Sequence, residues 1–218
     1  MKPAMQRRQQ ALRDILGLAP VVAVVVVENI ADAVPMASAL VAGGIPAIEI
    51  TLRTPVALEA IAAVARDVDG AVVGAGTVLG AHDLQAARRA GAQFAVSPGA
   101  TPALLAAAAD GELPLLPGAA TASEAMALRE QGYLLQKFFP AEAAGGADYL
   151  RALAGPLPGI GFCPTGGVRI ANAPAYLALP NVICVGGSWL TPDAAIRNGD
   201  WAAITQLARA AAALRGGN

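Results

Sequence analysis

One lysine stands out among the residues that could do chemistry. Lys137 is one of only two lysines in the chain, whereas thirteen basic residues are arginines, and it lies inside the apolar run 134–138. Burying an unpaired ammonium group is costly, but a buried lysine can lose its proton, and the free amine can attack a carbonyl carbon. We therefore interpret Lys137 as a candidate Schiff-base nucleophile. A surface lysine on an edge strand is the alternative.

Two more candidates lie in residues 47–53, where polar and aliphatic side chains alternate. The two-residue period of a strand places Glu49 and Arg53 on one face and leaves only Ile and Leu side chains on the other. Helices usually cover the aliphatic face of a parallel strand. We therefore expect Glu49 and Arg53 to point into the interior of the fold. A purely structural ion pair between them is the alternative.

Glycine pairs follow two of the later apolar runs. Residues 165–167 read Thr-Gly-Gly, and residues 186–188 read Gly-Gly-Ser. Glycine allows backbone N–H groups to approach an anion closely. Two such loops favour a phosphorylated ligand, with ordinary glycine turns as the alternative.

The elements that must position these residues follow a regular pattern. Eight apolar runs begin at intervals of roughly 20 to 27 residues, with Ala-rich helical segments between them. Alternating units of near-equal length are typical of a closed parallel barrel rather than an open sheet. We predict an α/β fold, a (β/α)₈ TIM barrel, as a single domain over residues 1–218. The predicted strands are 21–27, 47–52, 71–74, 94–97, 113–117, 134–138, 161–165 and 182–186.

The helix signals fit between these runs. Residues 5–16 predict an extra amphipathic helix before the first strand, and residues 202–214 predict a closing helix. Thr101, which precedes a proline, and Ser123 are typical helix N-caps. Helices are expected to stop at the glycines at positions 43, 91 and 132.

This architecture would gather the candidate residues at one place. The loops at the carboxyl ends of barrel strands build the active site, and loops seven and eight form the recurrent phosphate site. Interior layers come from alternate strands. Glu49 on the second strand and Lys137 on the sixth are therefore expected to face each other across the interior.

Composition excludes several other classes of protein. The formal net charge is -1, with 15 basic and 16 acidic residues, which disfavours nucleic-acid binding. Residues 18–27 are the longest apolar stretch, about half of a spanning helix, so no membrane segment is expected. Arginines before this stretch and small residues after it resemble a secretory signal, but its β-branched residues suit a buried strand better.

The residues that could bind a metal or a cofactor are few. His82 is the only histidine, and Cys163 and Cys184 lack metal-ligand spacing. Residues 74–80 match a dinucleotide-binding fingerprint only loosely, because the last spacing is too long. We therefore expect no metal and no cofactor, and two buried thiols in a protein of the reducing cytoplasm.

Six motifs together resemble a known family, the class I 2-keto-3-deoxy-6-phosphogluconate (KDPG) aldolases, which also act as 4-hydroxy-2-oxoglutarate (KHG) aldolases. The resemblance extends over residues 20–201. The motifs are GGIPAIEITLRTP (43–55), VGAGTVL (73–79), FAVSPG (94–99), KFFPAE (137–142), FCPTGG (162–167) and GGSWL (186–190).

The resemblance implies a role for each matching residue. Lys137 would form the imine with the keto carbon of the substrate, and Glu49 would act as general acid and base. Arg53 and Thr77 would hold the pyruvyl carboxylate. The remaining substrate-binding residues would be Pro98 and Phe139, which shape the pocket, Thr165, which positions the substrate, and Gly166, Gly167 and Ser188, which bind the distal phosphate.

The activity implied is cleavage of KDPG to pyruvate and D-glyceraldehyde 3-phosphate, as in the Entner-Doudoroff pathway, together with cleavage of KHG to pyruvate and glyoxylate. The resemblance also implies a homotrimer without a cofactor. Two alternatives are an aldolase for the galactonate epimer of the same substrate and a non-catalytic barrel that binds a phosphorylated ligand.

Overall fold

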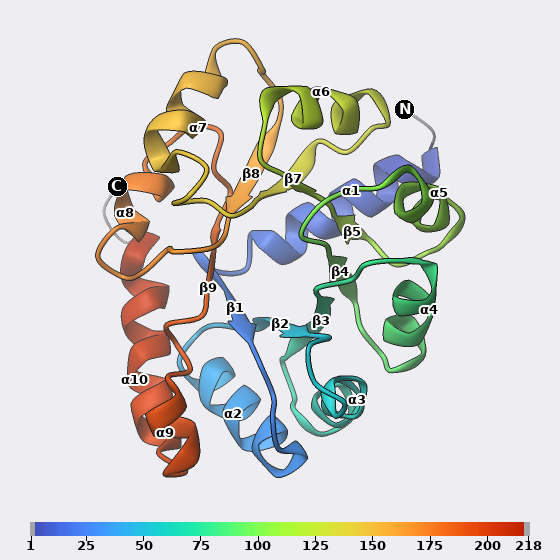
Figure 1. Ribbon diagram of the computed structural model, residues 1–218. Coiled ribbons are helices and arrows are strands. Elements are labelled where there is room, and N and C mark those ends of the chain that lie inside the picture. Colours follow the sequence, from blue (N-terminus) through green and yellow to red (C-terminus); the bar gives the residue numbers. More distant parts are fainter. Residues whose placement is uncertain (1–2, 216–218) are drawn as a thin grey trace.

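The computed structural model describes residues 3–215, so Lys2 lies outside the described residues. The chain forms an α/β fold in which a curled parallel sheet is surrounded by helices (Figure 1). Six strands pair in the order β5-β4-β3-β2-β1-β9, and three pair in the order β6-β7-β8. All pairings within these sheets are parallel.

The strand bounds lie close to the predicted runs. The six-stranded sheet contains β1 (Val21–Val25), β2 (Ala47–Thr51), β3 (Val72–Gly76), β4 (Phe94–Val96), β5 (Leu115–Leu116) and β9 (Val185–Gly187). The three-stranded sheet contains β6 (Gly118–Ala119), β7 (Leu135–Phe138) and β8 (Gly161–Pro164).

The two sheets meet at both of their edges. Only Pro117 separates β5 from β6, and it breaks the predicted fifth strand because a proline has no N–H to donate to a ladder. On the other side, two isolated parallel bridges connect β8 and Thr165 to the last predicted strand. The last predicted strand, 182–186, is observed as β9, which begins only at Val185. At Val182 the chain makes a single isolated bridge, to Phe162.

One helix precedes β1, and the others follow the strands in sequence. They are α1 (Pro3–Leu16), α2 (Ile30–Ala42), α3 (Ala57–Asp67), α4 (Ala81–Arg89), α5 (Pro102–Asp110), α6 (Ala122–Glu130), α7 (Gly146–Ala154), α8 (Ala173–Leu177), α9 (Asp193–Arg197) and α10 (Trp201–Ala212), with a short 3₁₀ turn η1 (Ala213–Arg215) at the end. None of the helices in residues 3–215 is long and apolar enough to cross a membrane.

One predicted helix start is wrong, and another is confirmed. Thr101 caps α5 by accepting a hydrogen bond from the Leu104 N–H. The cap of α6 is Thr121 rather than Ser123. Thr121 and Glu124 form a capping box in which each side chain accepts a hydrogen bond from the other's backbone N–H, and this reciprocal pair fixes the start of the helix.

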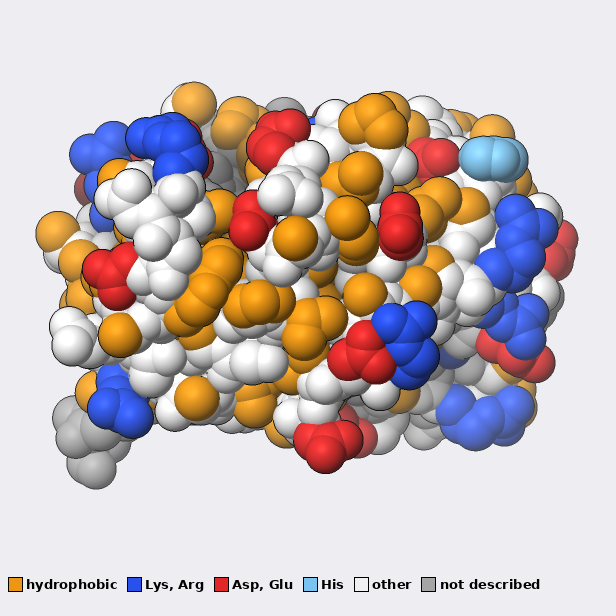
Figure 2. All heavy atoms as spheres, turned by 90° about the horizontal axis from the view of Figure 1, so that it is seen from below, with side chains coloured by type: hydrophobic (Ala, Val, Ile, Leu, Met, Phe, Trp, Pro, Cys, Tyr) orange, Lys and Arg blue, Asp and Glu red, His pale blue; other side chains and the backbone are white. Residues whose placement is uncertain are grey.

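Figure 2 shows the side of the molecule that lies at the bottom of Figure 1, where α2 and α3 are placed. Hydrophobic side chains are grouped across the middle of this surface, with acidic and basic side chains around and between them. We call it the α2–α3 face. Partly exposed apolar residues of these two helices include Ile30, Val34 and Leu58.

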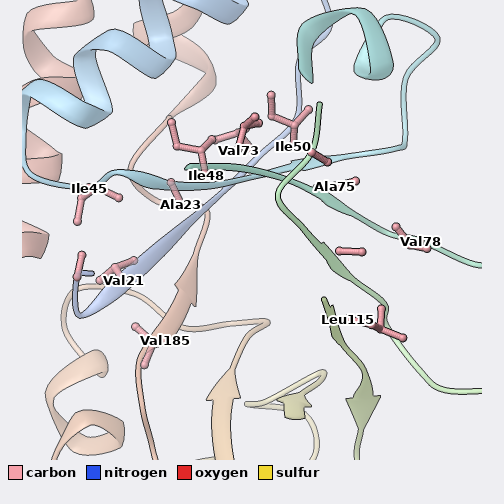
Figure 3. Packing of buried hydrophobic residues seen from close by; sticks show 14 of the residues in the cluster. Val21, Ala23, Ile45, Ile48, Ile50, Val73, Ala75, Val78, Leu115 and Val185 are labelled. Atoms are coloured by element: carbon pink, nitrogen blue, oxygen red, sulfur yellow. The ribbon is translucent and has the colours of Figure 1, made fainter. Parts of the chain in front are cut away.

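The core has two parts, one on each side of the sheet. The outer part packs the sheet against the helices and contains Ile48 and Ile50 of β2 (Figure 3). The inner part lies within the curl and contains Ala47 from the same strand. The predicted division of β2 into an aliphatic outer face and an inner face that carries Glu49 is therefore confirmed.

Helix α1 lies against one end of the inner core. Its Leu12 and Leu16 belong to the inner cluster. The Gln9 side-chain oxygen accepts hydrogen bonds from the N–H groups of Leu134 and Leu135, at the amino end of β7. The amino ends of the strands are therefore covered, and the site residues lie toward the carboxyl ends.

Candidate active site

An amine and a carboxylate from distant strands meet inside the curled sheet. Lys137 Nζ on β7 lies 3.3 Å from Glu49 Oε1 on β2 and donates a hydrogen bond to it. The lysine side chain is 6% exposed and the glutamate side chain 3%. The prediction that these residues face each other is confirmed, and the alternative of a surface lysine is excluded.

Both members of this pair are buried and in direct contact. A buried ion pair loses hydration that its own attraction only partly replaces. Moving one proton from the Lys137 ammonium to the Glu49 carboxylate gives two neutral groups without changing the net charge of the site. The same contact can therefore hold a charged pair or supply a neutral nucleophilic amine together with a carboxylic acid.

An aromatic ring borders the amine. Lys137 Nζ lies 5.1 Å from the centroid of the Phe139 ring, within the range of a cation–π contact. Phe139 is half-buried and follows β7 directly. Pro98 is near the same amine. Gly118 on β6 pairs with Lys137, and Gly118 is in close contact with Pro98, because a Cβ on Gly118 would lie 2.3 Å from the Pro98 carbonyl oxygen.

The neighbouring strand ends carry Arg53 and Thr77. The Arg53 Nε–H donates a hydrogen bond to Thr77 Oγ1 over 3.2 Å. The guanidinium is exposed, and its other N–H groups have no protein acceptor in the described part of the chain. Glu49 pairs with Lys137 instead of Arg53, so the expected alternative of a Glu49–Arg53 ion pair is wrong. Arg53 is therefore free to bind a carboxylate.

Thr77 has an unusual backbone. Within residues 3–215 it is the one non-glycine residue with a positive φ angle, 59°. A β-branched residue in the left-handed region costs on the order of 1–3 kcal/mol, and such strain is concentrated at functional sites. This conformation places the Thr77 hydroxyl beside Arg53 at the end of β3.

The loop after β8 has its carbonyl groups directed into the protein. Gly166 and Gly167 adopt φ angles of 99° and 79°, which favour glycine. Each of three successive carbonyl oxygens accepts a hydrogen bond: Thr165 O from Ala141 N at 2.8 Å, Gly166 O from Glu142 N at 3.0 Å and Gly167 O from Asn172 Nδ2 at 3.3 Å.

The N–H groups of the same peptide units point the other way. The C=O and N–H of a trans peptide lie on opposite sides of the chain, so the N–H groups of residues 166–168 are directed away from the protein partners of the carbonyls. None of the three donates to an acceptor in the part of the chain that the structure describes. Consecutive free N–H groups of this kind bind anions such as phosphate.

The second glycine loop lies beside the first. A Cβ on Gly186 would be 2.2 Å from Thr165 Oγ1, and the two residues form a parallel bridge. Ser188 follows β9 directly and is exposed. The structure therefore brings together the residues of both predicted glycine loops. Two residues that contact this loop were not predicted from the sequence. They are Asn172 and Glu142, and Glu142 lies in the same motif as Lys137.

Comparisons with known proteins agree with this arrangement. The family model described as "KDPG and KHG aldolase" matches residues 12–207. A protein of Escherichia coli K12 named KHG/KDPG aldolase is 52% identical over 207 residues, which cover 95% of this chain and 97% of that protein.

Two solved structures are similar in sequence and in fold. A KDPG aldolase from Legionella pneumophila, with pyruvate captured as a covalent carbinolamine intermediate, has a TM-score of 0.89 and 46% identity, and covers 92% of this chain and 97% of its own. A KDPG aldolase from Zymomonas mobilis ZM4, with 3-phosphoglycerate, has a TM-score of 0.90 and 47% identity, and covers 95% and 97%.

Proposed function

Because the chain belongs to the KDPG and KHG aldolase family, we propose that it cleaves KDPG into pyruvate and D-glyceraldehyde 3-phosphate through a Schiff base on Lys137. One observation carries the catalytic assignment. The buried Lys137 amine lies 3.3 Å from the Glu49 carboxylate, at the end of the fold where the two glycine loops also lie.

The first stage forms the imine. Glu49 accepts the proton of the Lys137 ammonium, and the neutral amine attacks the C2 carbonyl carbon of the substrate. The carbonyl oxygen takes up one proton from the attacking amine and one from Glu49 and leaves as water, which gives a protonated imine and a Glu49 carboxylate. The carbinolamine captured in the Legionella enzyme is the intermediate of this type of addition.

The second stage breaks the bond between C3 and C4. Glu49, as a carboxylate, removes the proton of the C4 hydroxyl, and the electrons of the C3–C4 bond move into the protonated imine. The aldehyde product leaves, and an enamine remains on Lys137. Glu49 returns a proton to C3, and water hydrolyses the imine to release pyruvate.

Binding groups surround this centre. Arg53 presents its free guanidinium N–H groups to the substrate carboxylate, because a planar fork can bind both oxygens and keeps its charge. Thr77 orients Arg53 and contributes its own hydroxyl to the same carboxylate. Phe139 and Pro98 form apolar walls beside the imine, and Thr165 positions the substrate between the catalytic pair and the glycine loops.

The phosphate is bound at the glycine loops. The free N–H groups of Gly166 and Gly167, together with the Ser188 hydroxyl, supply donors for a dianion. A second activity, cleavage of KHG to pyruvate and glyoxylate, needs only the catalytic pair and the carboxylate site. The name of the Escherichia coli relative, which includes both substrates, supports this second activity.

We also propose that the curled sheet closes into a (β/α)₈ barrel, with β5 and β6 as two parts of one strand and α1 as an extra helix. The bridges between β8 and the β9 segment support closure. A homotrimer is proposed on the family resemblance, and the α2–α3 face offers apolar surface for contact between copies. Cys163 and Cys184 are buried and form no disulfide in the described part of the chain, which fits a cytoplasmic protein.

Borohydride reduction in the presence of pyruvate tests the catalytic proposal. We expect peptide mass mapping to find one reduced pyruvate adduct on Lys137. Lys137→Arg should abolish the adduct, because arginine keeps its proton, whereas Lys2→Arg removes the other lysine and should leave the adduct unchanged. Folded protein without an adduct on Lys137 would overturn the Schiff-base assignment.

A further inference from the structure

A glutamate and a tyrosine lie against the glycine loop without belonging to the catalytic pair. Tyr176 on α8 is 1% exposed, and its hydroxyl donates a hydrogen bond to Glu142 Oε1. Glu142 lies in the segment after β7 and is exposed. The bond therefore connects the segment after the lysine strand to the segment after the glycine loop, two parts of the chain that lie 34 residues apart.

Glu142 is in direct contact with the loop. A Cβ on Gly167 would lie 2.6 Å from Glu142 Cγ, so the glutamate side chain packs on the Gly167 α-carbon. The Glu142 N–H also donates to the Gly166 carbonyl oxygen over 3.0 Å. Any movement of Glu142 is therefore transmitted to the peptides whose N–H groups face the phosphate.

The hydroxyl also restrains a negative charge. In the described residues Glu142 makes no ion pair with an arginine or lysine, and Tyr176 is its side-chain hydrogen-bond donor. Burial, and then the hydrogen bond to Glu142, raises the pKa of Tyr176 above its usual value, so the hydroxyl stays a donor at working pH. Without it, the carboxylate could turn toward the free N–H groups of the loop and compete with phosphate.

We propose that Tyr176 and Glu142 are positioning residues that hold the 165–167 loop in its phosphate-binding shape and so determine the preference for a phosphorylated substrate. The proposal rests on the phosphate site described under Proposed function. It adds two side chains that do not touch the reacting atoms, and it predicts an effect on the phosphorylated substrate alone.

The experiment compares kcat/KM for KDPG with kcat/KM for 2-dehydro-3-deoxygluconate, which lacks the phosphate. We expect Tyr176→Phe to lower the ratio of these two efficiencies roughly three- to tenfold, through a higher KM for KDPG. Adding Glu142→Gln to Tyr176→Phe removes the competing charge and should restore part of the ratio. Tyr133→Phe is the control, because Tyr133 is buried near the amino end of β7 and its hydroxyl has no hydrogen-bond partner among residues 3–215.

A second variant keeps the test decisive if Tyr176→Phe does not fold. Glu142→Ala changes an exposed side chain and removes its packing on the Gly167 α-carbon, so it should lower the same ratio. An unchanged ratio in either variant, or an equal loss on both substrates, would overturn the positioning role. A wild-type enzyme that does not prefer KDPG over its dephosphorylated form would instead overturn the phosphate site itself.

Discussion

Gly76 lies directly against the carboxylate of Glu49. A Cβ built on Gly76 would be 2.3 Å from Glu49 Oε1 and 2.6 Å from its Cγ, and real Cβ atoms do not approach other atoms so closely. Gly76 is the last residue of β3, the strand that pairs with β2. The missing side chain at position 76 therefore creates the space in which the Glu49 carboxylate reaches Lys137.

Gly76→Ala should reduce turnover while the protein stays folded. The added methyl group displaces the Glu49 carboxylate from the amine, and a misplacement of about 1 Å in a catalytic group can cost on the order of 10²-fold in rate. Steady-state kcat for KDPG measures the effect. Gly80→Ala is a matched control, because a Cβ there would have no described neighbour within 4 Å. A kcat equal to that of the wild type would show that the Glu49 carboxylate does not depend on the space beside Gly76.

Glu49→Gln should separate imine formation from bond cleavage. The amide keeps the size and one acceptor of the carboxylate but is not a base, and loss of a general base costs roughly 10²- to 10⁴-fold. We expect borohydride still to trap pyruvate on Lys137, more slowly because water must then take the ammonium proton, while kcat for KDPG falls by this amount. Retained turnover would assign proton transfer to a different group.

Arg53→Lys should weaken binding of the pyruvyl carboxylate. A lysine keeps the charge but lacks the planar fork, so KM for KDPG and for KHG should rise about tenfold, with a smaller change in kcat. Thr77→Val keeps the β-branched shape, removes the Oγ1 that accepts from Arg53, and should change KM in the same direction. If only one of the two substrates is affected, Arg53 does not bind the group that they share.

Ser188→Ala should raise KM for KDPG roughly three- to tenfold, the value of one hydrogen bond to a charged group. The dephosphorylated substrate should be cleaved as by the wild type. Ser38→Ala, at an exposed serine of α2, is the control. An equal rise in KM for both substrates would place Ser188 away from the phosphate.

Thr121→Ala should destabilise the protein by about 1 kcal/mol, because it removes the side-chain acceptor that caps α6. Ser123→Ala, inside the same helix, should cost less. Urea denaturation measures both values. A larger loss for Ser123→Ala would show that the helix begins later than the capping box indicates.

Much of the fold and the central pair could be predicted from local patterns. The two-residue alternation in β2 alone indicated that Glu49 points inward, and the shortage of lysines drew attention to Lys137. Features that depend on a single residue are harder to predict. Pro117 divides one strand into β5 and β6. The start of α6 depends on the capping box of Thr121 and Glu124, although the Thr-x-x-Glu spacing is present in the sequence.

Other features could not be predicted from sequence patterns, because they depend on packing between distant segments. No local preference places a β-branched residue such as Thr77 at a positive φ. Tyr176 and Glu142 meet only after α8 packs beside the segment that follows β7. The roles of the substrate-binding residues stay predictions that the variants above can test.

The contact between Gln9 and β7 has a consequence for protein synthesis. Gln9 and Leu134 lie 125 residues apart, so α1 leaves the ribosome long before the strand that receives it. Until then Leu12 and Leu16, both fully buried in the finished fold, have no inner core to pack against. Contacts over such a distance form late and slow folding. Helix α1 is therefore made well before the strand on which it docks, and its side chains Leu12 and Leu16 stay exposed to water until that strand is in place.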